Sequence, residues 1–119
     1  MKIALITKDR SLDSDLDIRF ARGNFILIYN TENKAHDFIK NDTENSHGAG
    51  PKMIECIVKN GVDAIIAHSL GKNAFDAANA AGMKVFESSG GNVIENIKKM
   101  TENGLHELNT FSDDHINLK

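Results

Sequence analysis

Short apolar runs recur along the chain, separated by polar segments and turn residues. Runs of this kind are typical of strands that a sheet buries on both faces. Four of them predict strands at residues 3–6, 25–29, 62–67 and 83–86. A fifth, more polar strand is predicted at residues 34–40, where the turn residues 30–33 join it to the second strand as a hairpin.

Three other segments space their apolar residues as the buried face of a helix does. They lie at residues 51–60, at residues 72–81 and from residue 93 to near Gly104. Pro51 fits the first position of the first helix, and Asn92 with Glu95 resembles a capping box at the start of the third. The order of a strand, a hairpin and then alternating helices and strands predicts an α/β fold, with a mixed sheet that carries helices on its faces.

The composition indicates one globular domain. Hydrophobic residues make up 40% of the 119 residues and charged residues 26%, which is ordinary for a folded domain. We expect this domain at residues 1–104, followed at residues 105–119 by a tail that either adds an edge segment or is flexible. The net charge of −3 gives no overall positive field. No nucleic acid or membrane is therefore expected as a partner, and any anion site must be local.

Cys56 is the only cysteine, which excludes an internal disulfide and a four-thiolate zinc site. It lies near the apolar stripe of the first predicted helix, so we expect a packed core thiol. The first apolar run ends at Thr7 and is too short for a signal peptide or a membrane span. The sequence therefore predicts a complete cytoplasmic protein.

The polar stretch at residues 8–23 is long for a connection, and such loops are commonly functional or mobile. Its last part alternates apolar and polar residues, which predicts a half-buried extended segment. The apolar residues of this alternation are Leu16, Ile18 and Phe20, and the polar ones are Asp15, Asp17 and Arg19.

Two glycine-bearing loops, at residues 47–51 and 68–73, each run into a predicted helix. A helix start presents unpaired N–H groups and a partial positive charge, and nearby glycines let a ligand approach the backbone. Both loops could therefore bind an anion, although ordinary turn glycines explain the pattern about equally well.

Basic residues and histidines accompany these loops. Arg19 and Arg22 lie late in the long polar stretch, and Lys72 lies in the first turn of the second helix, where a bound anion would compensate its charge. His47 and His68 flank the glycines and could ligate a metal. Each of them is more commonly a loop histidine that hydrogen-bonds to backbone or water.

Taken together and in order, several segments resemble the dinitrogenase iron-molybdenum cofactor biosynthesis family over about residues 1–104. They lie at residues 19–22, 25–30, 48–51, 61–67, 70–75 and 80–85. The resemblance implies a ribonuclease H-like fold, with a five-stranded mixed sheet of order 3-2-1-4-5 whose strand 2 is antiparallel. Several family members bind or carry iron-molybdenum cofactor or its precursors during nitrogenase assembly. Arg19 stands where some members have a ligand histidine, and Ala21 replaces a glycine.

This resemblance implies a non-catalytic carrier. Its cargo would be the iron-molybdenum cofactor of nitrogen fixation, a precursor or a related molybdenum or iron–sulfur cluster, and other cluster-assembly proteins would be its partners. A regulatory module that binds a small anion or metabolite without metal is the alternative. The predicted binding residues are Arg19, Phe20, Arg22, Gly48, Gly50, Gly71, Lys72 and Asn73, with His47 and His68 as optional metal ligands.

The fold implied by the resemblance also raises a nuclease hypothesis, which the sequence disfavours. Such an enzyme needs an acidic residue in the first strand and others that converge on two metal ions. Residues 3–6 contain no acid, and Asp63 lies at the beginning of its strand, the wrong end. No nucleophile and base can be paired from the motifs either, so we expect no enzymatic activity.

Overall fold

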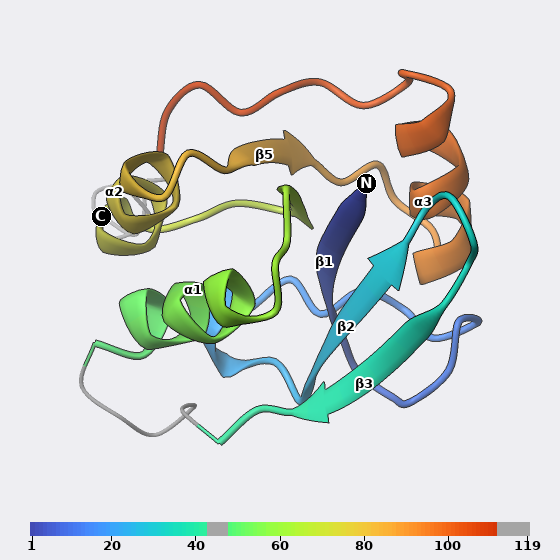
Figure 1. Ribbon diagram of the computed structural model, residues 1–119, viewed down its shortest axis with the longest axis horizontal. Coiled ribbons are helices and arrows are strands. Elements are labelled where there is room, and N and C mark those ends of the chain that lie inside the picture. The colour runs from blue at the N-terminus through green and yellow to red at the C-terminus, as the bar shows by residue number, and fades with distance from the viewer. Residues whose placement is uncertain (43–47, 112–119) are drawn as a thin grey trace.

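Five strands form one mixed sheet, covered by three α-helices, in the computed structural model, which describes residues 1–42 and 48–111. The elements in chain order are β1 (Lys2–Thr7), the 3₁₀ helix η1 (Phe20–Arg22), β2 (Phe25–Asn30), β3 (His36–Lys40), α1 (Ala49–Lys59), β4 (Ala64–Ala67), α2 (Lys72–Ala80), β5 (Lys84–Glu87) and α3 (Val93–Thr101). The sheet order is β3-β2-β1-β4-β5, and β2 runs antiparallel to both of its neighbours (Figure 1). The predicted fold class and strand order are confirmed.

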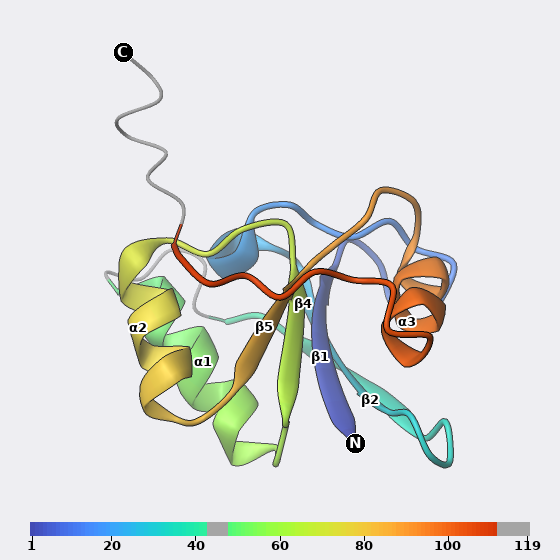
Figure 2. The same ribbon diagram turned by 90° about the horizontal axis from the view of Figure 1, so that it is seen from above.

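The helices lie on both faces of the sheet. Figure 2 shows α1 and α2 on one face and α3 on the other. Alternate residues of β1 are buried on opposite faces of the sheet. Ala4 and Ile6 belong to the core beneath α1 and α2. Ile3 and Leu5 belong to the core beneath α3. This two-sided burial is why β1 reads as one continuous apolar run. Within the described ranges, no helix is long and apolar enough to cross a membrane.

Most element ends differ from the sequence prediction by one or two residues, and α3 ends at Thr101, three residues before Gly104. Two of the differences have a clear cause. Helix α1 begins at Ala49, so Pro51 is its third residue and not its first. Proline is tolerated there because no N–H group in the first turn has an intrahelical partner. Strand β3 begins at His36 because Lys34 adopts a left-handed conformation, with φ of 64°, that belongs to the hairpin turn.

The first part of the predicted tail lies along β5. The Glu87 N–H donates to the His106 carbonyl oxygen at 2.8 Å, and the Leu108 N–H donates to the Val85 carbonyl oxygen at 2.8 Å. Leu108 and Phe111 pack against the core beneath α1 and α2. Figure 1 shows this orange-red segment running from α3 along β5 to α2. It therefore extends the β5 edge of the sheet and ends beside α2.

Candidate functional site

A cleft of about 1000 Å³ lies just beyond the carboxyl ends of β4 and β5. Figure 2 shows η1 and the starts of α1 and α2 gathered at this edge of the sheet. Its volume is at the upper end of the roughly 300–1,000 Å³ that ligand pockets usually have. Every predicted site residue within the described part of the chain lines it, namely Arg19, Phe20, Arg22, Gly48, Gly50, His68, Gly71, Lys72 and Asn73. His47 lies outside the described residues.

The loop before η1 departs from the predicted alternation. Asp17 is buried, with 5% of its surface exposed, whereas Ile18 is 64% exposed. The prediction that the apolar residues of this segment turn inward is therefore wrong at Ile18. The cause is local hydrogen bonding, because the Asp17 N–H donates to the Ile6 carbonyl oxygen at 2.8 Å and the Asp17 carboxylate binds Arg19.

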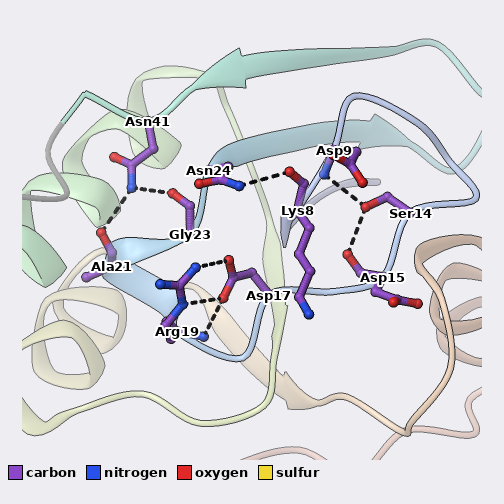
Figure 3. Close-up of polar contacts among 10 residues, drawn as sticks. All are labelled: Lys8, Asp9, Ser14, Asp15, Asp17, Arg19, Ala21, Gly23, Asn24 and Asn41. Atoms are coloured by element: carbon purple, nitrogen blue, oxygen red, sulfur yellow. Dashed lines mark hydrogen bonds and ion pairs between the residues drawn. The ribbon is translucent and has the colours of Figure 1, made fainter.

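Asp17 and Arg19 form a paired contact at the edge of the cleft (Figure 3). The Arg19 guanidinium donates from Nε to Oδ1 at 3.0 Å and from Nη2 to Oδ2 at 2.8 Å, and the Arg19 backbone N–H also donates to Oδ1 at 3.0 Å. The Asp17 side chain is 1% exposed and that of Arg19 is 59% exposed. Hydrogen bonding to Arg19 holds the pKa of Asp17 below its usual value, against the opposing effect of burial, and the charges of Arg19 and Lys8 add to the lowering.

The η1 turn that follows is fixed from two sides. Asn41, buried before α1, donates from Nδ2 to the carbonyl oxygens of Ala21 at 3.0 Å and Gly23 at 2.8 Å (Figure 3). Phe20 is buried in the core beneath α1 and α2. A Cβ atom on Gly23 would lie 2.0 Å from the Ile6 Cγ2 atom, so only glycine fits there. Neither Asn41 nor Gly23 stands out in the sequence, because both act through contacts with residues distant along the chain.

Both helix starts at the cleft have glycine as the N-cap residue. Gly48 precedes α1 with φ of 68°, and Gly71 precedes α2 in an extended conformation. Neither glycine has a side chain to accept from the N–H groups of the first turn. Gly50 has a packing role, because a Cβ atom there would lie 3.0 Å from the Cβ atom of Ala74 in α2. The two helix starts therefore lie close together and without a side-chain cap.

The charged residues that line the cleft are mostly cationic. Among the described residues that line it, Arg19, Arg22 and Lys72 are cationic, and Glu87 is the only carboxylic acid. Lys72 donates from Nζ to Oδ2 of Asp76 at 2.7 Å, and its Nζ lies 5.8 Å from the centre of the Phe111 ring. Two of these cations, Arg19 and Lys72, pair with the carboxylates of Asp17 and Asp76, which lie outside the lining.

The sequence profile of the family described as dinitrogenase iron-molybdenum cofactor matches residues 1–103. The chain belongs to this family. An uncharacterised protein of Methanocaldococcus jannaschii is 30% identical over 109 residues, which cover 91% of this chain and 92% of that protein. The family resemblance seen in the sequence is confirmed.

Solved structures show the same fold. A Thermotoga protein described as a candidate NifB protein has a TM-score of 0.84 and 37% identity, over 95% of this chain and 97% of that one. The apo form of the orange protein from Desulfovibrio gigas has a TM-score of 0.89 over 94% of this chain and 96% of that one. Its identity of 24% supports the fold alone.

This member of the dinitrogenase iron-molybdenum cofactor family offers few metal ligands in the cleft. Arg19 stands where some family members have a ligand histidine, and its guanidinium is bound to Asp17. His68 is exposed just after β4. Across residues 1–42 and 48–111, no three His, Cys, Asp or Glu side chains come together in a way that could hold a metal ion.

Two residues considered for chemistry lie outside the cleft lining. Cys56 is half-buried and packs against the core beneath α1 and α2. Asp63 precedes β4, and its Oδ2 accepts a hydrogen bond of 2.9 Å from the Lys2 backbone N–H. Asp63 is thus at the amino end of β4, whereas the cleft lies beyond the carboxyl end.

Proposed function

We propose that this protein is a non-catalytic carrier of an anionic metal cluster, either iron-molybdenum cofactor, a precursor or a related molybdenum or iron–sulfur cluster. The observation that carries the proposal is the cleft in which two arginines and a lysine meet two closely packed helix starts. Membership of the dinitrogenase iron-molybdenum cofactor family favours a metal cluster as the anion. Other cluster-assembly proteins would deliver and receive this cargo.

The chemistry of the cleft suits such a cargo. Helix starts attract anions because their first N–H groups lack intrahelical partners and carry partial positive charge. Guanidinium groups pair well with anionic oxygen, and their diffuse charge is also suited to sulfide at a cluster surface. Binding through N–H donors leaves the cluster's own metal coordination intact, which is what a carrier needs if it is to release its cargo unchanged.

The residues that line the cleft also favour binding without catalysis. General acid–base or two-metal chemistry needs acidic groups or bases that converge on the substrate. Glu87 is the only carboxylic acid among the described cleft residues, and Asp63 lies at the other end of its strand. We therefore propose that the protein holds its ligand without transforming it.

A metal-free regulatory module is the second candidate function. The described cleft offers one imidazole, that of His68, and its other polar groups suit any small oxyanion of matching charge. A phosphate- or carboxylate-bearing metabolite would use the same helix starts and arginines.

Anaerobic purification from the native cells, followed by metal analysis and visible spectroscopy, separates the two candidates. A cluster carrier is expected to contain molybdenum or iron in a fixed ratio to protein and to absorb visible light. After exposure to a chelator and desalting, the absorbance and the metal should disappear together. Metal-free, colourless protein that retains a phosphorylated or carboxylated metabolite would instead support the second candidate.

A further inference from the structure

We propose that Asp17 is a positioning residue that fixes the Arg19 guanidinium for the bound anion. This inference rests on the proposed function, because it assigns to Asp17 a part in binding at the same cleft. The geometry behind it is the contact between a buried carboxylate and an arginine that lines the cleft.

Asp17 is itself held firmly in place. Its N–H group donates to the Ile6 carbonyl oxygen of β1 at 2.8 Å, which ties the loop to the central sheet. A Cβ atom on Gly23 would lie 3.1 Å from the Asp17 Cβ atom, so a larger residue there would press on the Asp17 side chain. The carboxylate therefore has a fixed position and is 1% exposed.

Arg19 is attached to this fixed point by more than a simple charge contact. Its Nε and Nη2 atoms bind the two oxygens of the carboxylate, an arrangement that sets the plane of the guanidinium as well as its location. The Arg19 backbone N–H binds the same carboxylate, so the start of η1 and the guanidinium are fixed together (Figure 3). Bonds of this kind restrict the rotamers of a long, exposed side chain, so less conformational entropy is lost when a ligand binds it.

The charge of Asp17 acts in the opposite direction. A carboxylate near the cleft repels an anion, so simple electrostatics predicts tighter binding when Asp17 is neutralised. A positioning role predicts weaker binding, because the guanidinium loses the paired bonds that set its plane and the ligand must help to order it. The sign of the change on Asp17→Asn therefore separates the two roles.

The test is an anaerobic titration with tetrathiomolybdate, a simple molybdenum–sulfur anion, followed by visible absorbance. The proteins are the natural chain, Asp17→Asn, Arg19→Ala and the double variant Asp17→Asn/Arg19→Ala. We expect Asp17→Asn to weaken binding about threefold or more, as the cost of ordering one long side chain suggests. In the Arg19→Ala background, the same substitution should change the affinity little, because Asp17 acts through Arg19.

Asp15→Asn is the matched control, since it removes the same charge from the same loop at an exposed side chain. Tighter or unchanged binding by Asp17→Asn would overturn the proposal, and so would an equal loss in both backgrounds, which would indicate a general structural effect. If Asp17→Asn does not fold, Arg19→Lys is titrated in its place, because lysine keeps the positive charge but cannot form the two parallel bonds to the carboxylate. Binding by Arg19→Lys as tight as that of the natural chain would also overturn the proposal. Failure of the natural chain to bind would count against the proposed function instead.

Discussion

The start of α3 and the starts of α1 and α2 are built in opposite ways. At α3, the Asn92 side chain accepts a hydrogen bond of 3.0 Å from the Glu95 N–H, an acidic residue lies in the first turn, and lysines lie in the last. Helices α1 and α2 start after Gly48 and Gly71, with no acidic residue in the first turn. The helix far from the cleft has a side-chain cap, whereas the two at the cleft begin after glycines that supply none.

We propose that the two glycine caps leave the first-turn N–H groups available to a ligand in the cleft. A side-chain cap would occupy the N–H groups of the first turn, and an acidic residue would cancel the positive end of the helix. Both would stabilise the helix and weaken its attraction for an anion.

The close packing of α1 on α2 is the feature whose loss should have the largest effect. Gly50→Val would place side-chain carbons against Ala74, where even a Cβ atom has only 3.0 Å. We expect a loss of about 2 kcal/mol in the free energy of unfolding, within the range for overpacked sites, together with weaker tetrathiomolybdate binding. Urea denaturation measures the first effect. Gly90→Val is the control, because nothing lies within 4 Å of a Cβ atom there, and equal stabilities of the two variants would contradict the packing role.

A new side-chain cap at α2 should raise the stability of the protein and weaken anion binding, whereas Gly50→Val should lower both. Gly71 has extended backbone angles that an N-cap aspartate can adopt, and a Cβ atom there meets nothing within 4 Å. We expect Gly71→Asp to raise the free energy of unfolding by up to about 1 kcal/mol. Tetrathiomolybdate affinity should fall about tenfold, as expected when a carboxylate occupies the helix start. Gly90→Asp carries the same charge change, and an equal loss of affinity there would show that net charge alone is responsible.

Removal of the natural cap at α3 should affect stability alone. Asn92→Ala deletes the acceptor for the Glu95 N–H and should cost about 1 kcal/mol in thermal or urea denaturation. Asn92→Ser, which keeps a capping oxygen, should stay close to the natural stability. Anion affinity should not change in either variant. A clear loss of affinity in Asn92→Ala would show that the two regions are not independent.

The smallest expected effect is a pH dependence at Asp17. Because the pKa of Asp17 is lowered in the folded protein, its contribution to stability is present above the unfolded value of about 3.9 and is lost as the pH falls through the lower folded value. The pair with Arg19 is partly exposed, so we expect less than about 1 kcal/mol. Melting temperatures of the natural chain and Asp17→Asn should differ at pH 6 and converge towards pH 3. A constant difference would contradict this account.

The sequence was informative where local patterns decide the structure. The continuous apolar run of β1 and the Asn92–Glu95 spacing at α3 each predict their element because burial and capping act over a few residues. The strand order came from family resemblance, since periodicity does not specify which strands are neighbours. The glycine loops were found because each runs into a predicted helix, whose start presents unpaired N–H groups.

The missed parts of the site depend on contacts that no local pattern encodes. Asp17 was assigned to the polar side of an alternating segment, yet it is buried because it binds Arg19 and the Ile6 backbone. Asn41 holds the turn at Gly23 across 18 residues of sequence. The energy of such polar contacts depends on a geometry that forms only in the folded chain.

The central claim is that positive charge at this cleft binds an anionic cluster, and an anaerobic tetrathiomolybdate titration of Arg19→Ala/Arg22→Ala tests it most directly. The account predicts that affinity falls about tenfold or more, as expected when charge-assisted hydrogen bonds are lost. It also predicts that the remaining binding depends less on salt concentration. Affinity and salt dependence equal to those of the natural chain, in a variant that unfolds at the same temperature, would contradict it.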